Sequence, residues 1–301
     1  MMRRRFVTVD VFTERPFGGN PLAVVLDAEG LTAAQMQAVA REFNYSETTF
    51  VLPPRSPDHD AWVRIFTPGS ELPFARHPNV GTAFVLGRLD SAGAGERLVF
   101  EEAAGLMPVD LLREGGTMVG AELTAPERLQ RRDAMAAADI AACFSLAVDD
   151  VATMAHGPVT ASVGLAFVIV ALSSRGALAR MQTDRAAFRR HLPCSGANAV
   201  FAYVRDGNDV QARMFAPLSG IDEDPATGSA TCALVALLAD LAPEPVLDLR
   251  LRVEQGVDMG RPSLLLARAR KEAGQVVEVK VGGRCVPMLE GTFHLAGEVA
   301  N

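Results

Sequence analysis

A six-residue pattern that could position chemistry occurs twice in the chain. It reads Pro-Asn-Val-Gly-Thr-Ala at 78–83, directly after His77, and Pro-Ala-Thr-Gly-Ser-Ala at 225–230, directly after Asp224. Proline suits the first turn of a helix, because the backbone N–H that it lacks would have no acceptor there. Two helix starts, each with a titratable side chain ahead of it, predict one site between two similar halves. The repeat therefore favours an enzyme.

The segments around the two copies are also alike. A strand-like stretch precedes each copy, Arg-Ile-Phe-Thr-Pro at 64–68 and Arg-Met-Phe-Ala-Pro at 213–217. An apolar segment with helical character follows each copy, at 83–89 and at 230–241. The similarity thus extends to the elements that must hold the two titratable side chains in place.

His77 is the first candidate for chemistry. Backbone N–H groups at a helix start point toward an anion lying over it. The helix dipole disfavours a charged histidine there, and a neutral imidazole is suited to proton exchange. A helix cap or a structural histidine in the core is the alternative for this residue alone. The repeat favours the functional interpretation.

Asp224 occupies the same slot in the second copy. Aspartate is also among the best N-cap residues, and a solvated acidic loop is a further alternative. In the functional interpretation, the backbone N–H of Gly228 and the hydroxyl of Ser229 bind a substrate carboxylate, with Gly81 in the matching place of the first copy. We do not expect Ser229 to be a nucleophile, because no histidine lies near it in its motif.

Glu47 is the third candidate. It lies in Asn-Tyr-Ser-Glu-Thr-Thr-Phe at 44–50, where a predicted helix is followed by an apolar strand. Burial in a cleft would raise the pKa of this carboxyl and make it an acid and base near neutral pH. The alternative is a carboxylate that accepts hydrogen bonds from nearby backbone N–H groups. Spacing alone leaves both open.

Composition narrows the class of protein. The 301 residues carry a net charge of −7, with 49% hydrophobic and 22% charged residues, as in a folded domain without a nucleic-acid partner. Gly-rich phosphate loops are absent. The four cysteines form no Cys-x-x-Cys pair, so we expect no metal site and buried, reduced thiols in a cytoplasmic protein. The uncharged stretch 151–174 has only a short dense apolar part, which favours a buried strand over a membrane span.

Periodicity and turn signals predict mostly strands, with one principal helix in each repeat. Residues 31–44 form the clearest helix, because Thr32 and Gln35 make a capping-box pattern. Further helices are expected at 140–146 and 183–191. Strands are expected at 6–12, 48–52, 61–66, 98–101, 107–112, 119–123, 161–172, 198–204, 210–215, 247–253, 263–268 and 276–281. A turn at Gly282-Gly283 is expected before a last strand around 284–288.

Several stretches together resemble the PhzF-like family of isomerases from phenazine biosynthesis, which shares its fold with diaminopimelate epimerase. The matching stretches lie at 17–21, 44–51, 64–68 with 71–75, 77–78, 223–230, 255–256 and 259–263. They span nearly the whole chain.

The resemblance implies an α+β fold of two pseudo-symmetric lobes, each a β-barrel-like sheet around a central helix, with the site between them. We expect an N-terminal lobe at 1–127, with the last strand at about 287–301 as its candidate completion, and a C-terminal lobe at 128–286. The resemblance also implies a cofactor-free isomerase, a homodimer and a small-molecule carboxylate substrate. Glu47 would be the principal acid and base, and His77, Asp224 and Ser229 would line the site. Asn20 and Arg76 complete the expected substrate-binding residues.

Two positions depart from the family pattern. Gly-His-Pro-Thr is usual in the family, whereas this chain has Arg76-His77-Pro78-Asn79. A guanidinium at this place could bind a carboxylate through two hydrogen bonds, block the pocket, or point to the surface. A binding or regulatory protein that has lost catalysis is therefore the second hypothesis.

A thiol racemase is the third hypothesis. In the epimerase relatives, cysteines occupy the slots of His77 and Asp224, and here neither slot is a thiol. Cys232 lies eight residues beyond Asp224, inside the predicted helix. The leading hypothesis remains an isomerase in which Glu47 takes a proton from one carbon and returns it to another.

Overall fold

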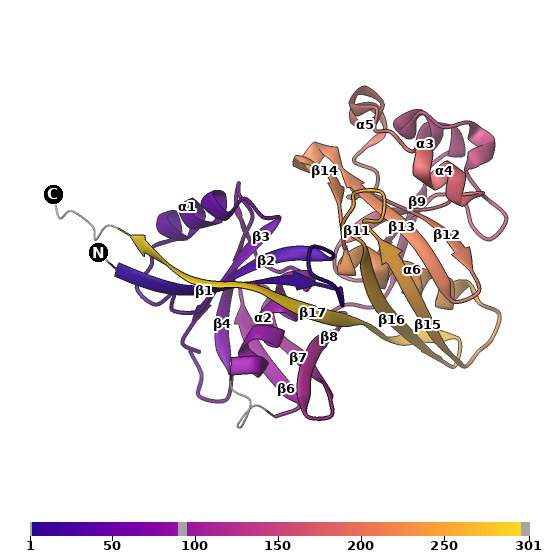
Figure 1. Cartoon of the computed structure of the whole chain (residues 1–301). Coiled ribbons are helices and arrows are strands. Elements are labelled where there is room, and N and C mark those ends of the chain that lie inside the picture. Colours follow the sequence, from indigo (N-terminus) through magenta and orange to yellow (C-terminus); the bar gives the residue numbers. More distant parts are fainter. Residues whose placement is uncertain (1, 90–94, 296–301) are drawn as a thin grey trace. The chain divides into compact units, whose positions relative to one another are not determined.

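The computed structural model describes residues 2–89 and 95–295, and in these residues a mixed sheet is accompanied by few helices (Figure 1). The helices are α1 (Ala33–Phe43), α2 (Arg76–Leu89), α3 (Ala137–Phe144), α4 (Arg175–Arg180), α5 (Arg185–His191) and α6 (Gly228–Leu241). Two 3₁₀ turns, η1 (Val148–Asp150) and η2 (Pro217–Ser219), lie between them. The strands are β1 (Met2–Val11), β2 (Asn20–Val25), β3 (Glu47–Leu52), β4 (Ala61–Phe66), β5 (Glu71–Leu72), β6 (Arg97–Glu102), β7 (Gly105–Glu114), β8 (Thr117–Thr124), β9 (Gln130–Ala134), β10 (Val159–Ser162), β11 (Ala166–Ala171), β12 (Val200–Asp206), β13 (Asp209–Ala216), β14 (Ile221–Asp224), β15 (Leu247–Gln255), β16 (Ser263–Glu272) and β17 (Gln275–Leu295).

Contacts divide the chain into two compact units. Unit 1 is Met1–Leu123 with Gly283–Asn301, and unit 2 is Thr124–Gly282. Strand β17 contributes its first part to unit 2, where it pairs with β16, and its remainder to unit 1, where it pairs with β1. Residues 296–301, the end of the segment predicted to complete the N-terminal lobe, lie outside the described residues.

Unit 1 is a ring of strands around one helix. Strands β1 to β8 pair in sequence order, with β5 attached to the edge of β4; β2–β3 and β4–β6 are parallel and the other pairs antiparallel. Strand β17 pairs with both β1 and β8 and so closes the ring. Helix α2 contacts β1, β2, β3 and β7, and most of its residues are buried (Figure 1). The ring thereby holds the start of α2 fixed.

Unit 2 repeats this order of pairings. From β10 to β17 the neighbours β11–β12 and β13–β15 are parallel and the others antiparallel, with β14 attached to β13. Helix α6 contacts β10, β11, β15 and β16, and it is buried from Gly228 through Ala239. Because its sequence is apolar on every face, α6 belongs in a core rather than on a surface. Another apolar cluster of unit 2 lies around α3, α4 and α5.

Local signals predicted several elements well. The capping box at the start of α1 is present: Gln35 N–H donates to Thr32 Oγ1, and Thr32 N–H donates to the Gln35 side chain. The helices expected at 140–146 and 183–191 are α3 and α5. The stretch 161–172 is not one strand region but two strands, β10 and β11, with a break between them. Helix α4 and strands β2, β5, β9 and β14 were not predicted.

The turn predicted at Gly282-Gly283 is wrong, because β17 runs unbroken through both glycines. A Cβ added at Gly120 of β8 would lie 2.0 Å from the carbonyl oxygen of Gly283. The small residues therefore permit a close backbone approach between β8 and β17. Long-range pairing, which adjacent glycines do not reveal, decides the conformation here.

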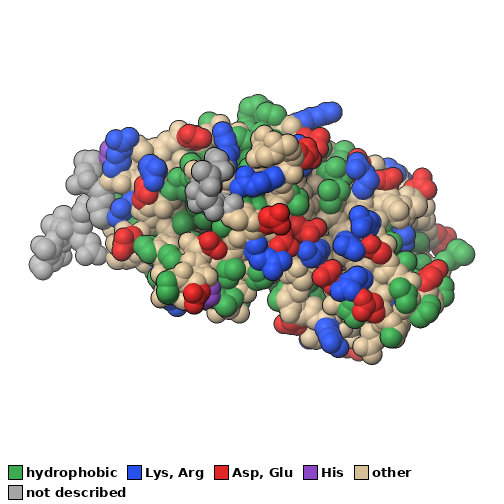
Figure 2. Space-filling view, turned by 90° about the horizontal axis from the view of Figure 1, so that it is seen from below, with side chains coloured by type: hydrophobic (Ala, Val, Ile, Leu, Met, Phe, Trp, Pro, Cys, Tyr) green, Lys and Arg blue, Asp and Glu red, His purple; other side chains and the backbone are tan. Residues whose placement is uncertain are grey.

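The cysteines, the absence of a metal cluster among the described residues, the helices and the surface charge bear on the class of protein. None of the four cysteines, all of which lie among the described residues, forms a disulfide, and Cys143, Cys232 and Cys285 are buried. Residues 2–89 and 95–295 contain no cluster of His, Cys, Asp and Glu suited to a metal ion. Over the same residues, no helix has the length and apolar character needed to cross a membrane. Figure 2 shows acidic and basic side chains interspersed on the face that it presents.

Candidate active site

Glu47 and His77 lie against each other in unit 1. Glu47 is the first residue of β3, and His77 is the second residue of α2. Glu47 Oε2 lies 3.2 Å from His77 Nε2, and the two side chains are 12% and 7% exposed. Residues 30 positions apart in the sequence (77 minus 47) are thus paired in a mostly buried place. A carboxylate and an imidazole in contact can hold or exchange a proton.

His77 is held in its neutral form. Burial lowers the pKa of His77 to about 3 from its ordinary 6.5. A neutral imidazole was predicted, but for another reason: desolvation is the cause here, whereas the helix dipole was expected to act. At neutral pH, Nε2 of the neutral imidazole can therefore carry a hydrogen that faces the carboxylate of Glu47, without the positive charge of an imidazolium.

Three local contacts place Glu47. The chain leaves α1 through Asn44, whose φ of 53° is the left-handed conformation that asparagine tolerates at a helix end. Glu47 then pairs with Leu22 across the parallel β2–β3 neighbours. Two residues on, the hydroxyls of Thr49 and Thr82 lie 2.8 Å apart and join β3 to α2. Because both hydroxyls are buried, this hydrogen bond fixes the strand that carries the acid against the helix that carries the histidine.

Asn20 and Arg76 are both buried in unit 1. Asn20 begins β2 and is fully buried, and its Oδ1 accepts a hydrogen bond of 2.7 Å from Ser46, the residue before Glu47. Arg76 begins α2 and is 2% exposed. Its guanidinium carbon lies 5.4 Å from the centre of the Phe74 ring. The surface-pointing alternative for Arg76 is thereby excluded.

Gly81 has a packing role in unit 1. A Cβ at this position would lie 2.6 Å from Leu22 Cδ2 and 2.8 Å from Val11 Cγ2, so only glycine lets α2 approach β1 and β2 this closely. Its N–H lies beyond the first four residues of α2, the only ones whose N–H groups lack an intrahelical acceptor. The substrate contact predicted for Gly81 stays a prediction.

Asp224 is the centre of a hydrogen-bond cluster in unit 2. It is the last residue of β14, and the N-cap of α6 is Thr227, so Asp224 is not the N-cap residue. The Thr227 hydroxyl donates a short hydrogen bond to Asp224 Oδ2. Gln255 Nε2 donates to the carbonyl oxygen of Asp224 at 2.7 Å, and Gln255 Oε1 accepts from Thr227 N–H at 3.0 Å. Gln255 is fully buried and locks the turn between β14 and α6.

Gly228 and Ser229 open helix α6. They are its first two residues and are buried. Their N–H groups belong to the first turn, which has no intrahelical acceptors. Such N–H groups are suited to binding an anion at a helix start.

Sequence reasoning missed two polar contacts near the start of α2. One is the Thr49–Thr82 hydrogen bond, for which no sequence pattern is a signal. The other brings the side chain of Asn79, fully buried in the first turn, close to that of Glu102 at the end of β6. Burial raises the pKa of Glu102 to about 8, and the nearby Asn79 side chain opposes part of the shift. The alternation that buries Leu98 and Phe100 places Glu102 on the same inward face, and this signal could have found it.

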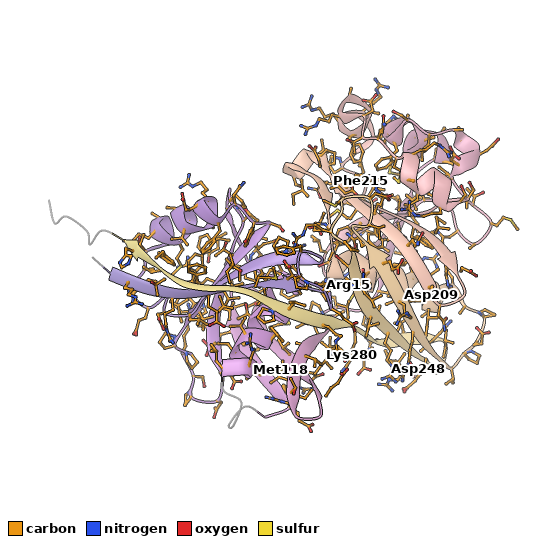
Figure 3. All side chains as sticks on the ribbon, in the orientation of Figure 1. Arg15, Met118, Asp209, Phe215, Asp248 and Lys280 are labelled. Carbon is orange, nitrogen blue, oxygen red and sulfur yellow. The ribbon has the colours of Figure 1, made fainter. Side chains whose placement is uncertain are left out.

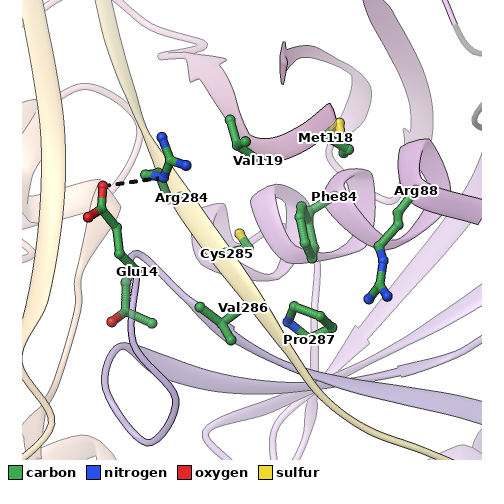
Figure 4. Close-up of a pocket in the computed structure, with 10 residues that line it drawn as sticks. Glu14, Phe84, Arg88, Met118, Val119, Arg284, Cys285, Val286 and Pro287 are labelled. Carbon is green, nitrogen blue, oxygen red and sulfur yellow. Dashed lines mark ion pairs between the residues drawn. The ribbon is translucent and has the colours of Figure 1, made fainter. Parts of the chain in front are cut away.

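A separate cavity of about 420 Å³ also lies in unit 1 (Figure 4). Side chains of α2, β8, β17 and the loop after β1 line it, among them Phe84 and Met118. Arg284 at its edge is ion-paired with Glu14 at 3.2 Å. None of the predicted site residues lines this cavity.

Comparisons with known proteins cover nearly the whole chain. A family model described as phenazine biosynthesis-like protein matches residues 9–291. A relative from Pseudomonas chlororaphis, trans-2,3-dihydro-3-hydroxyanthranilate isomerase, is 37% identical over 96% of this chain and 99% of its own. The crystal structure of a Bacillus anthracis phenazine biosynthesis protein of the PhzF family is similar, with a TM-score of 0.87, 25% identity and coverage of 98% and 100%. A hydroxyproline epimerase from Agrobacterium vitis has a TM-score of 0.63 at 16% identity, over 97% of this chain and 91% of its own, a similarity of fold alone.

Proposed function

Because the chain belongs to the phenazine biosynthesis-like family and is an isomerase, we propose that it moves a proton between two carbons of a small carboxylated substrate without a cofactor. Glu47 is the proposed acid and base. One observation carries this proposal: the carboxylate of Glu47 contacts a buried imidazole that stays neutral, 3.2 Å from Oε2 to Nε2. A carboxylate held in this way is ready to accept a proton and to return it.

In the proposed reaction, Glu47 removes a proton from one carbon and delivers it to another, so that a double bond moves along the substrate. Negative charge develops on the substrate between the two steps. In the proposal, a neutral His77 donates a hydrogen bond toward the carboxylate or toward the substrate. It does not take up the proton that Glu47 removes, because burial lowers its pKa. One carbon–hydrogen bond breaks and another forms, while the O–H bond of Glu47 forms and then breaks. The electron pair of the broken bond becomes the new double bond as the old one is lost, so electrons and protons balance within the substrate and Glu47.

Residues of unit 2 also have proposed roles in binding a carboxylated substrate. The N–H groups of Gly228 and Ser229, and the Ser229 hydroxyl, would bind a carboxylate, since the first turn of α6 offers N–H donors without intrahelical acceptors. The carboxyl group of Asp224 would influence which groups near the substrate are protonated. In unit 1, Asn20 and Arg76 are proposed to bind carboxylate and hydroxyl groups of a substrate. The planar guanidinium of Arg76 suits a carboxylate well, because it can donate two parallel hydrogen bonds.

The relatives indicate the proposed substrate class. The Pseudomonas chlororaphis protein is named for trans-2,3-dihydro-3-hydroxyanthranilate, an unsaturated cyclic amino acid. We propose a cyclic or unsaturated carboxylate of this class for the present chain. Action in the cytoplasm as a homodimer is part of the same proposal, through the family resemblance.

Deuterium exchange tests the proposal. The protein is incubated in D2O with a panel of small carboxylic acids that includes dihydro-hydroxyanthranilate, and carbon-bound deuterium is followed by NMR. We expect deuterium incorporation with the wild type and a loss of about 10²- to 10⁴-fold in rate for Glu47→Gln, the usual contribution of a general acid and base. Glu42→Gln is the matched control, because Glu42 is an exposed residue of α1 in the same unit.

The outcomes separate the two leading hypotheses. Full exchange by Glu47→Gln would refute the role of Glu47. Binding of a panel member by the wild type without exchange would refute the proposed reaction and favour a binding function. In that case Arg76→Gly tests whether the buried guanidinium prevents catalysis. Recovered exchange in this variant would identify Arg76 as the cause of the lost activity.

A further inference from the structure

Two arginine–glutamate pairs occupy corresponding places in the two units. In unit 2, Arg213 of β13 donates from Nε and Nη2 to the two carboxylate oxygens of Glu223 in β14, at 2.8 and 2.7 Å. In unit 1, Arg64 of β4 donates from Nε and Nη2 to the two oxygens of Glu71 in β5, at 2.7 Å each. A planar guanidinium matches a carboxylate in this two-bond geometry and fixes its orientation as well as its distance.

Strand pairing places the two glutamates at similar positions. Glu71 pairs with Phe66 across β4–β5. Across β13–β14, Met214 pairs with Asp224 and Ala216 with Ile221, so Asp222 and Glu223 lie together across from Phe215, where the register is irregular. Phe66 and Phe215 are the third residues of the strand-like stretches that precede the two motif copies.

Each arginine also lies over that phenylalanine. The guanidinium carbon of Arg64 is 5.2 Å from the centre of the Phe66 ring, and that of Arg213 is 4.8 Å from the centre of the Phe215 ring (Figure 3 labels Phe215). Arginine, phenylalanine and glutamate thus recur as a set. We call the two sets the Arg64 clamp and the Arg213 clamp.

The Arg213 clamp is the more buried and the nearer to its motif. The side chains of Arg213 and Glu223 are 10% and 15% exposed, against 18% and 38% for Arg64 and Glu71. Glu223 is the residue directly before Asp224, whereas Glu71 lies six positions before His77. A displacement of Glu223 therefore passes directly to Asp224 through one peptide bond.

Arg213 also ties a helix to the same strand. Its Nη1 donates to the carbonyl oxygen of Leu178 at 2.9 Å, and to those of Ala179 and Met181 at 3.3 Å each. These carbonyls belong to the end of α4, where carbonyls lack the donors of a continuing helix, although that of Leu178 also accepts from Met181 N–H. One buried guanidinium thus satisfies the end of α4 and the carboxylate of Glu223 together.

We propose that the Arg213–Glu223 pair is a positioning device for Asp224, with the Arg64–Glu71 pair as its counterpart in the segment that leads to His77. The inference rests on the proposed role of Asp224 in the reaction. The backbone of Asp224 is held at its carbonyl by Gln255 and at its N-terminal side by the clamped Glu223. Both attachments are required to set the direction of the Asp224 side chain.

A stabilising function alone does not explain such a pair. Burial of an ion pair costs desolvation free energy that the mutual attraction only partly offsets, so buried pairs contribute little net stability. Their geometry, by contrast, is strict. A misplacement of about 1 Å of a group near the reaction can lower the rate about 10²-fold.

The test compares three substitutions in the full-length protein. Glu223→Gln replaces one of the two acceptor oxygens with an amide and so breaks the two-bond geometry with little change in volume. We expect kcat to fall about 10- to 100-fold with KM changed much less, by the same misplacement argument. Glu71→Gln should lower kcat less, because Glu71 is more exposed and farther from its motif.

Asp248→Asn is the matched control. Asp248 of β15 accepts from Nε and Nη2 of Arg268 at 2.6 and 2.9 Å in unit 2, and these two side chains are 40% and 36% exposed (Figure 3 labels Asp248). We expect wild-type kcat for this variant. A fall in kcat of equal size for Asp248→Asn and Glu223→Gln would overturn the proposal, because it would show a general effect of losing such a pair.

A second readout needs no substrate. The carboxyl carbon of Asp224 is followed by ¹³C NMR in the wild type and in Glu223→Gln, and its resonance is assigned with Asp224→Asn. A changed chemical shift and titration of this carbon, in a variant with the wild-type thermal unfolding temperature, supports positioning. An unchanged Asp224 signal overturns it. If the wild type exchanges no deuterium, the proposed function fails, while the NMR comparison still decides the role of the clamp.

Discussion

Replacement of Glu102 by glutamine should stabilise the protein, and the gain should depend on pH. Burial raises the pKa of Glu102 to about 8 from 4.5, and both carboxylate oxygens are buried. Below pH 4.5 the carboxyl is protonated in the folded and the unfolded protein, so it has no effect on the free energy of unfolding. Between 4.5 and 8 the unfolded chain releases the proton and the folded chain keeps it, so stability falls as pH rises.

The magnitude follows from the two pKa values. One pKa unit corresponds to about 1.4 kcal/mol, so the penalty approaches about 3 kcal/mol at pH 7 and about 5 kcal/mol above pH 8. Glutamine has nearly the shape of the protonated acid, but its side chain cannot ionise. We therefore expect Glu102→Gln to raise the free energy of unfolding by up to about 3 kcal/mol at pH 7 and by nothing at pH 4.

The assay is urea unfolding of wild type and variant at a series of pH values between 4 and 9. Glu101→Gln provides a control of opposite sign from the neighbouring residue. Glu101 accepts from His59 at 2.8 Å and from the N–H groups of Arg55 and Ser56, and the hydrogen bond from His59 is the main cause that lowers its pKa. Its substitution should destabilise the protein at neutral pH, with the loss shrinking in acid. A stability gain for Glu102→Gln that is equal at pH 4 and pH 7 would refute the reasoning.

Two further substitutions test packing and the excluded chemistry. Gly81→Ala should destabilise by about 1–3 kcal/mol, because its methyl group would overlap side chains of β1 and β2, whereas Gly157→Ala, which faces open space, should have little effect in the same unfolding assay. A variant with all four cysteines replaced by alanine should retain isomerisation in the deuterium assay, because neither motif slot holds a thiol; loss of exchange in a variant that is still folded would contradict this expectation.

The candidate site could be predicted from the sequence where its residues lie in local motifs. The repeat identified His77 and Asp224 as equivalent slots without any structure. It did not show that helix α2 begins before His77, whereas α6 begins four residues after Asp224. Equal motif spacing therefore leads to unequal local structure. The difference arises because β14 extends to Asp224 and Thr227 takes the N-cap position.

Contacts between distant segments were not accessible in the same way. The contact of Glu47 with His77 depends on the order of strands around α2, which no local pattern encodes. Likewise, Arg213 and Glu223 are both visible in the sequence, but only the β13–β14 pairing brings them together. The glycine pair at 282–283 shows the converse error, because a local turn signal was overruled by the pairing of β17. Local propensity favours one conformation, and tertiary contacts can override it.

The burial of His77 bears on which residue acts as the base in the proposed reaction. A racemase that removes a proton on one face of a carbon and returns it on the other needs two groups of suitable basicity. Because burial lowers the pKa of His77 to about 3, the proposed reaction does not use His77 as the second base. In the proposal, Glu47 is then the group of unit 1 that both takes the proton and returns it. A single base reaches only one face of the substrate, so the proposed proton transfer ends on a different carbon of that same face, which is isomerisation rather than racemisation.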